Sequence, residues 1–232
     1  MKQKLIVIIP AYNEEPMIAS TIAGIQAQLD KPPLDDIPSH VIVVDDGSQD
    51  GTYQQASQPG VTLLRHRTNL GLGVALRTGF QAARDQHATW VVTFDADGQH
   101  HPRDLPKLVS PLFDDCADLV IGSRFLSENQ IPVIRRVTLW GANVLTWLIF
   151  GVWTSDSQSG LRALNQTAMD CIHLRTDRME VSSEIVAEAN RLGLRICEVP
   201  VGVTYSEYSR RKGQTFWNSF HVLYKLLLRR AR

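Results

Sequence analysis

The sequence predicts an α/β protein with a mostly parallel sheet and helices on both faces of that sheet. Two observations lead to this fold class. Short β-branched runs alternate with amphipathic stretches along the chain, and the first run, Leu5–Ile9, contains no polar residue. Alternating strands and helices are typical of parallel sheets, and a strand that is apolar on both faces is typical of a sheet with helices on each side.

Each element is predicted from its local pattern. In Gly71–His87 the apolar residues Leu72, Leu76 and Phe80 recur at helical spacing and share one face. The other helices are expected at Pro16–Leu29, Arg103–Phe113 and Ser182–Leu192. Strands are expected at Lys4–Ile9, His40–Val44, Val61–Leu64, Trp90–Phe94, Leu119–Gly122 and Ile196–Val203. We expect these elements to form a single domain over residues 1–232.

The composition narrows the class of protein. The 232 residues are 44% hydrophobic and 21% charged, which is typical of a chain with a folded core and excludes a disordered or collagen-like one. Lys and Arg number 24, as do Asp and Glu, and this balance argues against a nucleic-acid partner. The three cysteines lack the spacing of a zinc or redox motif. The first residues lack a signal-peptide pattern, so we expect a cytoplasmic location.

Polar clusters follow four of the expected strands. They are Pro10–Glu14, Asp45–Thr52, Asp95–His100 and Gly122–Arg124. In open α/β sheets ligands bind beyond the carboxyl ends of the strands, so we expect the four clusters to converge along one edge of the sheet. This edge is the predicted functional site.

The tripeptide Asp95-Ala96-Asp97 indicates a cation site. Aspartates at i and i+2 on an extended chain point alike, and their oxygens suit a divalent cation that bridges a nucleotide diphosphate. The alternative is a surface turn rich in Asp and Gly. The segment Asn69–Gly73, which opens an expected helix, leaves a similar choice between backbone amides near a phosphate and glycines for capping and close packing.

Taken together and in this order, the motifs resemble those of the family-two glycosyltransferases, which have the Rossmann-like GT-A fold. Within them the sequence is most similar to the polyprenyl-phosphate sugar transferases, the dolichyl-phosphate mannosyltransferase-like branch. The segments that carry the resemblance are Pro10–Glu14, Asp45–Thr52, Asn69–Gly79, Asp95–His100, Gly122–Arg124 and Asp156–Arg162. The resemblance implies an enzyme, either a hexosyltransferase or an N-acetylhexosaminyltransferase.

The resemblance also implies roles for single residues. The residues expected to bind a UDP- or GDP-sugar donor are Pro10, Tyr12, Glu14, Asp46, Asp95 and Asp97. The ligands expected for a divalent cation, Mg²⁺ or Mn²⁺, are Asp95, Asp97 and Gln99. The first four donor residues would face the nucleoside, and the aspartate pair would hold the ribose–diphosphate. The expected catalytic residues are Asp97, Asp156 and Arg124.

The acceptor side depends on what accepts the sugar. A hydroxyl needs a general base, whereas a lipid phosphate is already ionised and needs cations to bind it. The cations expected to bind an acceptor phosphate are Arg124, Arg135, Arg136, Arg211 and Lys212. Asp156 would orient the sugar, contact the metal, or act as the base for a hydroxyl acceptor; a helix N-cap or turn is the structural alternative.

Two segments, 125–155 and 205–232, are expected to lie near the membrane and the acceptor. The stretch 137–155 carries no charge, but it is near the lower length limit for a span, and a crossing would separate the two halves of the site. Phe216–Leu228 separates aromatic and aliphatic residues from cations, as in membrane-interfacial helices; a core-docking helix is the alternative. We therefore expect peripheral attachment to the cytosolic membrane face, which a small membrane protein could assist.

The expected function is metal-dependent, inverting transfer of a sugar from a nucleotide-diphosphate sugar to polyprenyl phosphate, undecaprenyl or dolichyl. Such a reaction belongs to cell-envelope glycan or glycoconjugate synthesis. A second hypothesis is transfer to a hydroxyl of a glycan or glycolipid, with Asp156 as the base. A third is a non-catalytic scaffold that binds sugar nucleotides, against which the intact pair Asp95 and Asp97 argues.

Overall fold

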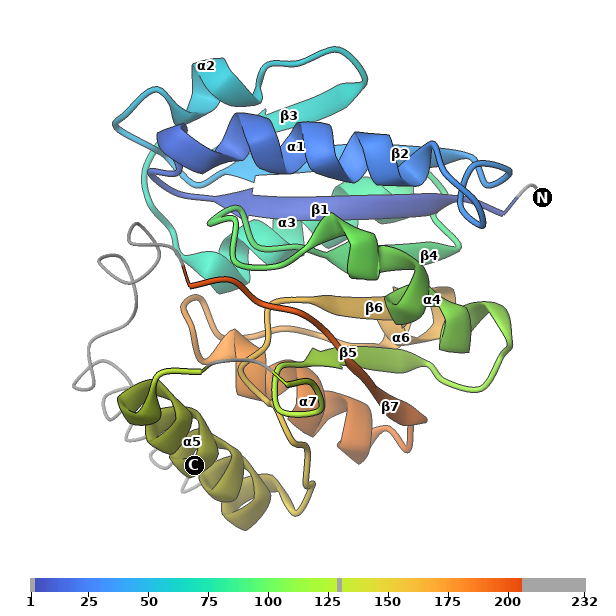
Figure 1. Cartoon of the computed structure of the whole chain (residues 1–232), viewed down its shortest axis with the longest axis vertical. Coiled ribbons are helices and arrows are strands. Elements are labelled where there is room, and N and C mark those ends of the chain that lie inside the picture. Colours follow the sequence, from blue (N-terminus) through green and yellow to red (C-terminus); the bar gives the residue numbers. More distant parts are fainter. Residues whose placement is uncertain (1–2, 129–130, 206–232) are drawn as a thin grey trace.

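The computed structural model describes residues 3–128 and 131–205, which form one seven-stranded sheet between helices (Figure 1). The strand order is β3-β2-β1-β4-β6-β5-β7. The strands are β1 (Leu5–Ala11), β2 (Ser39–Asp45), β3 (Val61–Arg65), β4 (Trp90–Thr93), β5 (Leu119–Ser123), β6 (Arg162–Asn165) and β7 (Ile196–Pro200). The helices are α1 (Glu15–Leu29), α2 (Thr52–Ala56), α3 (Leu72–Asp85), α4 (Leu105–Phe113), α5 (Val133–Phe150), α6 (Gln166–Cys171) and α7 (Val181–Arg191), with the 3-10 turn η1 (Pro102–Asp104).

The prediction of a mostly parallel sheet is confirmed, with one strand that the sequence did not predict. β1 pairs in parallel with β2 and β4, β2 pairs in parallel with β3, and β5 pairs in parallel with β7. The unpredicted strand β6 lies between β4 and β5 and runs antiparallel to both. Its sequence, Arg-Ala-Leu-Asn, has no β-branched residue and no alternation, so it carries no strand pattern. The short helices α2 and α6 were not predicted either.

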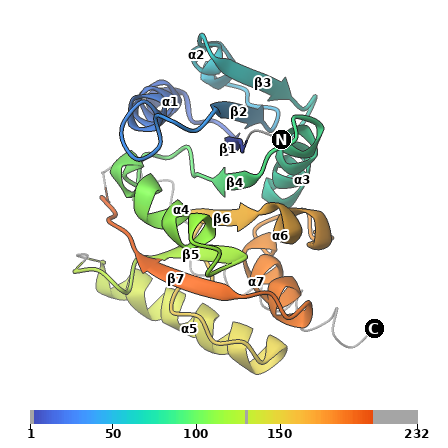
Figure 2. The ribbon, with the colours of Figure 1, turned by 90° about the vertical axis from the view of Figure 1, so that its right-hand side faces the viewer.

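Two apolar cores lie on the two faces of the sheet. Successive residues of β1 point to opposite faces, so Leu5, Val7 and Ile9 pack in one core with α1 and α4, while Ile6 and Ile8 pack in the other with α3, α6 and α7. Figure 2 shows these two sets of helices on opposite sides of the sheet. Burial of each such side chain is worth about 1.5–3 kcal/mol. The buried centre of the sheet therefore fixes the positions from which the loops leave its edge.

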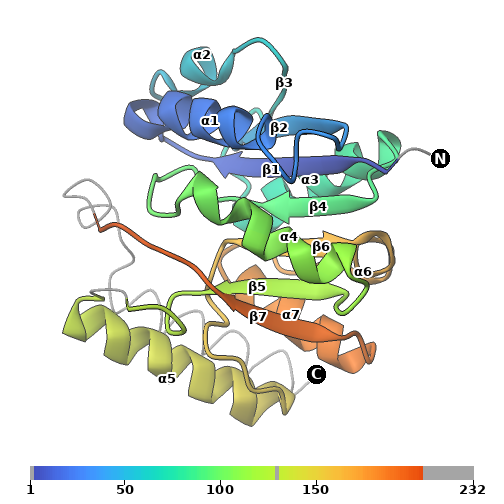
Figure 3. The same ribbon diagram turned by 45° about the vertical axis from the view of Figure 1, so that its right-hand side comes forward.

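Helix α5 lies at the β7 end of the molecule, far from β3 (Figures 2 and 3). It buries two polar residues, Asn143 and Thr146, and one apolar residue, Ile149. Its exposed large apolar residues are Val133, Ile134, Val137, Trp140, Trp147 and Leu148. Among the helices that the structure describes, none combines the length and the apolar character needed to cross a bilayer.

Part of the prediction lies outside the described residues. The interfacial helix expected at Phe216–Leu228 lies there, and so do Arg211 and Lys212; of the segment 205–232, only Tyr205 is described. The last predicted strand, Ile196–Val203, ends earlier, at Pro200, although Val203 forms an isolated antiparallel bridge with His100.

Candidate active site

The first two predicted clusters meet directly. β1 and β2 are paired up to their last residues, so the segments that follow them leave the sheet side by side. The backbone N–H of Asn13 donates to Ser48 Oγ at 2.9 Å, and that of Glu14 donates to Thr52 Oγ1 at 2.7 Å. Hydroxyl groups of the second cluster therefore fix the turn of the first. Pro10, at the end of β1, is half-buried.

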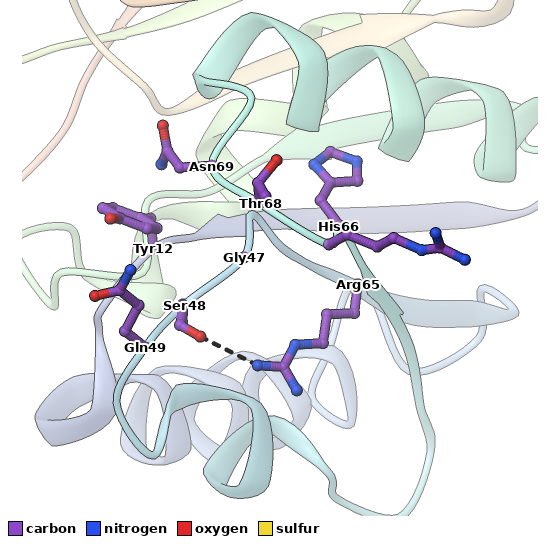
Figure 4. A pocket seen from close by; sticks show the side chains of 9 residues that line it. Tyr12, Gly47, Ser48, Gln49, Arg65, His66, Thr68 and Asn69 are labelled. Atoms are coloured by element: carbon purple, nitrogen blue, oxygen red, sulfur yellow. Dashed lines mark hydrogen bonds between the residues drawn. The ribbon is translucent and has the colours of Figure 1, made fainter.

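A cavity of about 470 Å³ lies where β1, β2 and β3 end. It is lined by Tyr12, Gly47, Ser48, Gln49, Arg65, His66, Arg67, Thr68 and Asn69. In Figure 4 the side chains of Tyr12, Gln49 and Asn69 lie on one side, and Arg65 reaches the carbonyl of Ser48 at 3.1 Å from the other. An aromatic ring, amides and a guanidinium together suit stacking and hydrogen bonding of a nucleobase.

Of the lining residues at and after the end of β3, Asn69 was selected from the sequence as the start of Asn69–Gly73, but Arg65, His66, Arg67 and Thr68 were not. The four strand ends selected from the sequence were rich in Asp or polar turn residues, unlike the third strand end, Arg65-His66-Arg67. The signal was present, because the rule that ligands bind beyond the ends of parallel strands applies to β3 as well.

Asp46, predicted to face the nucleoside, organises the loop before α3. It is 3% exposed, and its carboxylate accepts hydrogen bonds from the backbone N–H of Leu70 at 2.9 Å and of Gly71 at 2.7 Å. The same carboxylate lies 2.7 Å from His66 Nδ1, whose other ring nitrogen is 3.0 Å from Thr78 Oγ1. Asp46 thus links the end of β2 to His66 in the cavity wall and to the loop before α3. Its contact with the nucleoside, like that of Pro10, Tyr12 and Glu14, stays a prediction.

The glycines of that loop allow close packing against the segment before α7. A Cβ on Gly71 would lie 2.3 Å from the carbonyl oxygen of Asp177, and a Cβ on Gly73 would lie 1.9 Å from that of Thr176. Gly71 also has φ +105°, which disfavours other residues. The N–H of Gly73 donates to the carbonyl of Asp177 at 2.8 Å. These contacts favour the packing alternative over an open phosphate cradle.

Asp95 and Asp97 follow β4, and Gly160 leaves room for the side chain of Asp95. A Cβ on Gly160 would lie 2.1 Å from both carboxylate oxygens of Asp95, so a larger residue at 160 would displace this side chain. Asp97 accepts a hydrogen bond from the backbone N–H of Gln99 at 3.0 Å, and the side-chain amide of Gln99 also contacts it. The predicted ligands Asp97 and Gln99 are therefore in contact.

The charges in this part of the site favour a divalent cation. Partial burial, reinforced by repulsion from the Asp97 carboxylate, raises the pKa of Asp95 to about 7. Oxygen donors whose negative charges repel one another suit Mg²⁺ or Mn²⁺, because the cation relieves the repulsion. Among the described residues, no cluster of three or more His, Cys, Asp or Glu is arranged for a metal. The candidate donors are the two aspartates and the amide oxygen of Gln99.

Arg124, at the end of β5, forms a buried two-pronged ion pair with Asp156. Nε donates to Oδ2 and Nη2 to Oδ1, both at 2.6 Å, and the backbone N–H of Arg124 donates to Oδ2 at 3.0 Å. The two residues are 6% and 0% exposed. Burial disfavours the charged guanidinium, but the attraction of Asp156 prevails and raises the pKa of Arg124. Asp156 lies in the loop between α5 and β6, so the N-cap alternative was wrong, but its carbonyl accepts a hydrogen bond from the N–H of Ser159 at 3.2 Å, as expected of a turn residue.

Of the other predicted acceptor cations, Arg135 is held near this pair and Arg136 is exposed. The guanidinium of Arg135 stacks on the ring of Tyr205 at 4.8 Å. Burial lowers the pKa of Arg135, and the charges of Arg124, Asp97 and Asp95 also act on it. The charge of Arg135 therefore interacts with that of Arg124 and with those of the aspartate pair.

Arg162 is a buried cation that was not among the predicted site residues. It is 1% exposed, and its Nη2 donates to the carbonyls of Ser157 and Ser182, each at 2.8 Å. Burial lowers its pKa to about 10. The Gly160-Leu161-Arg162 motif was the available signal, but nothing in the sequence indicates that this arginine holds a loop rather than a ligand.

The aspartate pair after β4 and the cavity beyond β1, β2 and β3 lie at the same carboxyl edge of the α/β sheet, where sugar-nucleotide-dependent transferases with the GT-A fold bind their donor. The sequence model of the glycosyl transferase family 2 matches residues 6–173, and the chain belongs to that family. The predicted family and enzyme class are therefore confirmed.

Similar proteins support the same assignment. The UDP-N-acetylglucosamine–dolichyl-phosphate N-acetylglucosaminyltransferase of Methanococcus voltae is 36% identical, over 98% of this chain and 97% of that protein. The undecaprenyl-phosphate mannosyltransferase of Micrococcus luteus is 31% identical, over 90% and 87%. The crystal structure of the glucosyl-3-phosphoglycerate synthase of M. tuberculosis has a TM-score of 0.73 and 25% identity, over 98% of this chain and 80% of that chain.

Proposed function

We propose that the protein transfers a sugar from a nucleotide-diphosphate sugar to polyprenyl phosphate, with inversion at the anomeric carbon. One observation carries the acceptor class. The loop that holds Asp156 is hydrogen-bonded to α5, whose outer face is apolar and whose first turn carries Arg135 and Arg136. A lipid phosphate needs an apolar surface for its chain and cations for its phosphate, both beside the donor site.

The similar proteins support this acceptor and leave the sugar open. The two named relatives act on dolichyl phosphate and undecaprenyl phosphate, but one transfers N-acetylglucosamine and the other mannose. We therefore propose a polyprenyl phosphate acceptor and a UDP- or GDP-linked hexose or N-acetylhexosamine as the donor.

On the donor side, the cavity that contains Tyr12 would take the nucleoside, and Asp95 and Asp97 would take the diphosphate end. A bound Mg²⁺ or Mn²⁺ would neutralise the charge that develops on the departing nucleotide. Gly160 leaves the space that Asp95 occupies, and the two amide groups of Gln99 orient Asp97. The protein's own contribution is thus to hold two carboxylates in a fixed position at the end of β4.

On the acceptor side, the proposed reaction needs no general base. An oxygen of a phosphate monoester is already ionised near neutral pH and can attack the anomeric carbon directly. Asp156 is fully buried and both of its oxygens accept hydrogen bonds from Arg124, so a hydroxyl acceptor has little access to this carboxylate. This observation favours a lipid phosphate over a hydroxyl. Asp156 would orient the guanidinium of Arg124 toward the acceptor phosphate, with Arg135 and Arg136 beside it.

We also propose peripheral attachment to the cytosolic membrane face through the segments 125–155 and 205–232. The exposed Trp140 and Trp147 of α5 support this, because aromatic side chains on a helix with nearby cations are typical of membrane interfaces. The small membrane protein expected to assist attachment stays a prediction.

A donor screen tests the proposed function. The full chain would be incubated with Mn²⁺ or Mg²⁺ and one of several UDP- or GDP-sugars, with a short polyprenyl phosphate as the acceptor. The free polyprenol of the same length is the matched control, because it lacks only the phosphate. Product on the phosphate alone is expected. Product only on hydroxyl acceptors would select the hypothesis with Asp156 as the base, and nucleotide binding without transfer would select the scaffold.

A further inference from the structure

Helix α5 carries a buried asparagine, Asn143, which is not among the residues proposed to bind the donor, the metal or the acceptor. Asn143 is 2% exposed, whereas Trp140 and Trp147 of the same helix are exposed. Asparagine is a poor helix former, and a buried amide has to find hydrogen-bond partners. The partners of Asn143 therefore indicate why an asparagine occupies this position.

Asn143 binds the loop between α5 and β6 on both sides of Asp156. Its Nδ2 donates to the carbonyl of Ser155. Its Oδ1 accepts from the backbone N–H and from Oγ of Ser157, both at 2.9 Å. One side chain thus fixes the residue before and the residue after Asp156 relative to α5.

The same loop is held from a second direction by β7. Glu198 accepts hydrogen bonds from the backbone N–H of Ser155 at 2.8 Å and from that of Asp156 at 3.3 Å. Residues 151–161 contain no helix or strand, so side-chain bonds satisfy backbone groups that regular structure would otherwise pair. Asp156, held between α5 and β7, directs both carboxylate oxygens to Arg124.

We propose that Asn143 is a positioning residue of the acceptor side. It fixes Asp156, and through Asp156 the guanidinium of Arg124, in the orientation that receives the acceptor phosphate. The inference rests on the proposed function for the nature of the acceptor. Asn143 thus connects the helix with the exposed apolar face to the groups at the reacting centre, and Thr146 of the same helix adds a hydrogen bond to Ser157 Oγ at 3.3 Å.

Hydrogen exchange tests the geometry without reference to activity. The N–H of Ser157 is protected by Asn143 Oδ1, so Asn143→Ala in the full chain should accelerate its exchange by about tenfold or more. Ile149→Ala is the matched control, because Ile149 is buried on the same helix and offers no side-chain hydrogen bond to the loop. Unchanged exchange in Asn143→Ala, or equal acceleration in Ile149→Ala, would overturn the proposal.

Steady-state kinetics tests the role in acceptor use. Asn143→Ala should raise KM for a short polyprenyl phosphate, or lower kcat, by about tenfold to a hundredfold, while the Kd of the nucleotide-sugar is unchanged. Asn143→Asp keeps the size of the side chain but loses the Nδ2 donor, so it should show the same split. It replaces Asn143→Ala if the latter fails to fold. Unchanged acceptor kinetics in a folded variant contradict the role.

A double-mutant cycle tests whether Asn143 acts through Arg124. In an Arg124→Ala background, Asn143→Ala should cause little further loss of acceptor use, because the group that it positions is already absent. Fully additive losses would overturn the proposal. If the wild-type protein transfers no sugar to polyprenyl phosphate, the proposed function fails, and the exchange of the Ser157 amide still decides whether Asn143 holds the loop.

Discussion

The half of the sheet proposed to bind the donor, β3-β2-β1-β4, and the half proposed to bind the acceptor, β6-β5-β7 with α5, assemble their candidate sites in different ways. They are called the donor half and the acceptor half below. In the donor half all strands are parallel, and each site residue lies within a few positions of a strand end. In the acceptor half one strand is antiparallel, and Arg124 and Asp156, which are 32 residues apart, form the central pair. The donor site therefore follows from sheet topology, whereas the acceptor site depends on hydrogen bonds between distant segments.

The largest expected effect is a loss of sugar transfer at Asp97, in the donor half, with little change in stability. Asp97→Asn should lower transfer by several orders of magnitude, because loss of a charge-neutralising cation at the leaving group costs several kcal/mol of barrier. The free energy of unfolding should change little, since Asp97 is partly exposed and lies outside the cores. The measurement is turnover with Mn²⁺ or Mg²⁺, alongside denaturant unfolding.

Two controls accompany this prediction. A chelator should reduce wild-type turnover to a similar level, and Asp36→Asn, at an exposed position, should leave turnover unchanged. Turnover near the wild-type level in Asp97→Asn, or full activity in chelator, would rule out the metal-dependent mechanism.

The next effect concerns stability in the acceptor half. Asp156→Ala leaves the buried guanidinium of Arg124 without its carboxylate, so the free energy of unfolding should fall by about 3–5 kcal/mol. The double variant Arg124→Met/Asp156→Leu removes both charges and should recover much of this loss without recovering sugar transfer. Denaturant unfolding and acceptor kinetics check the two parts. A double variant as unstable as Asp156→Ala would mean that the pair stabilises through more than charge compensation.

A smaller effect is expected for the outer surface of α5. Trp140→Ser/Trp147→Ser should weaken binding to anionic vesicles by about tenfold or more, because two aromatic side chains no longer enter the interface. Leu70→Ser is the matched control, since Leu70 is exposed in the donor half. Co-sedimentation measures the binding. Equal weakening by Leu70→Ser would show that any exposed apolar residue suffices, and α5 would lose its special role.

The smallest effect is a pH dependence at the junction of β5, β6 and β7. Hydrogen bonds from Arg195 and Asn165 lower the pKa of Asp118 to about 2, below the ordinary aspartate value. The contribution of Asp118 to stability is therefore complete above about pH 4 and is lost as the pH falls through about 2. Asp118→Asn should have a shallower loss of stability with acid over this range, measured by unfolding at several pH values. Parallel curves for the two proteins would contradict this.

Most of the fold of the donor half could be predicted, because β1 and β2 are apolar runs with no polar face and α3 has one clear apolar side. β6 could not, because Arg-Ala-Leu-Asn becomes a strand only through pairing with two neighbours. The aspartates after β4 could be selected from the sequence, because two carboxylates at i and i+2 suit a divalent cation. Arg65 and His66 were overlooked although the same strand-end rule applies to them.

The sequence by itself determined the α/β class and the family, and it indicated the edge of the sheet that carries the candidate donor residues. These follow from local periodicity and from short motifs whose members are neighbours in the chain. Only the tertiary structure decided that Asp156 pairs with Arg124, that Asn143 and Glu198 hold its loop, and that Gly160 makes room for Asp95. The physical reason is that a buried polar group takes its partners from whatever segment packs against it, and a sequence pattern does not specify that segment.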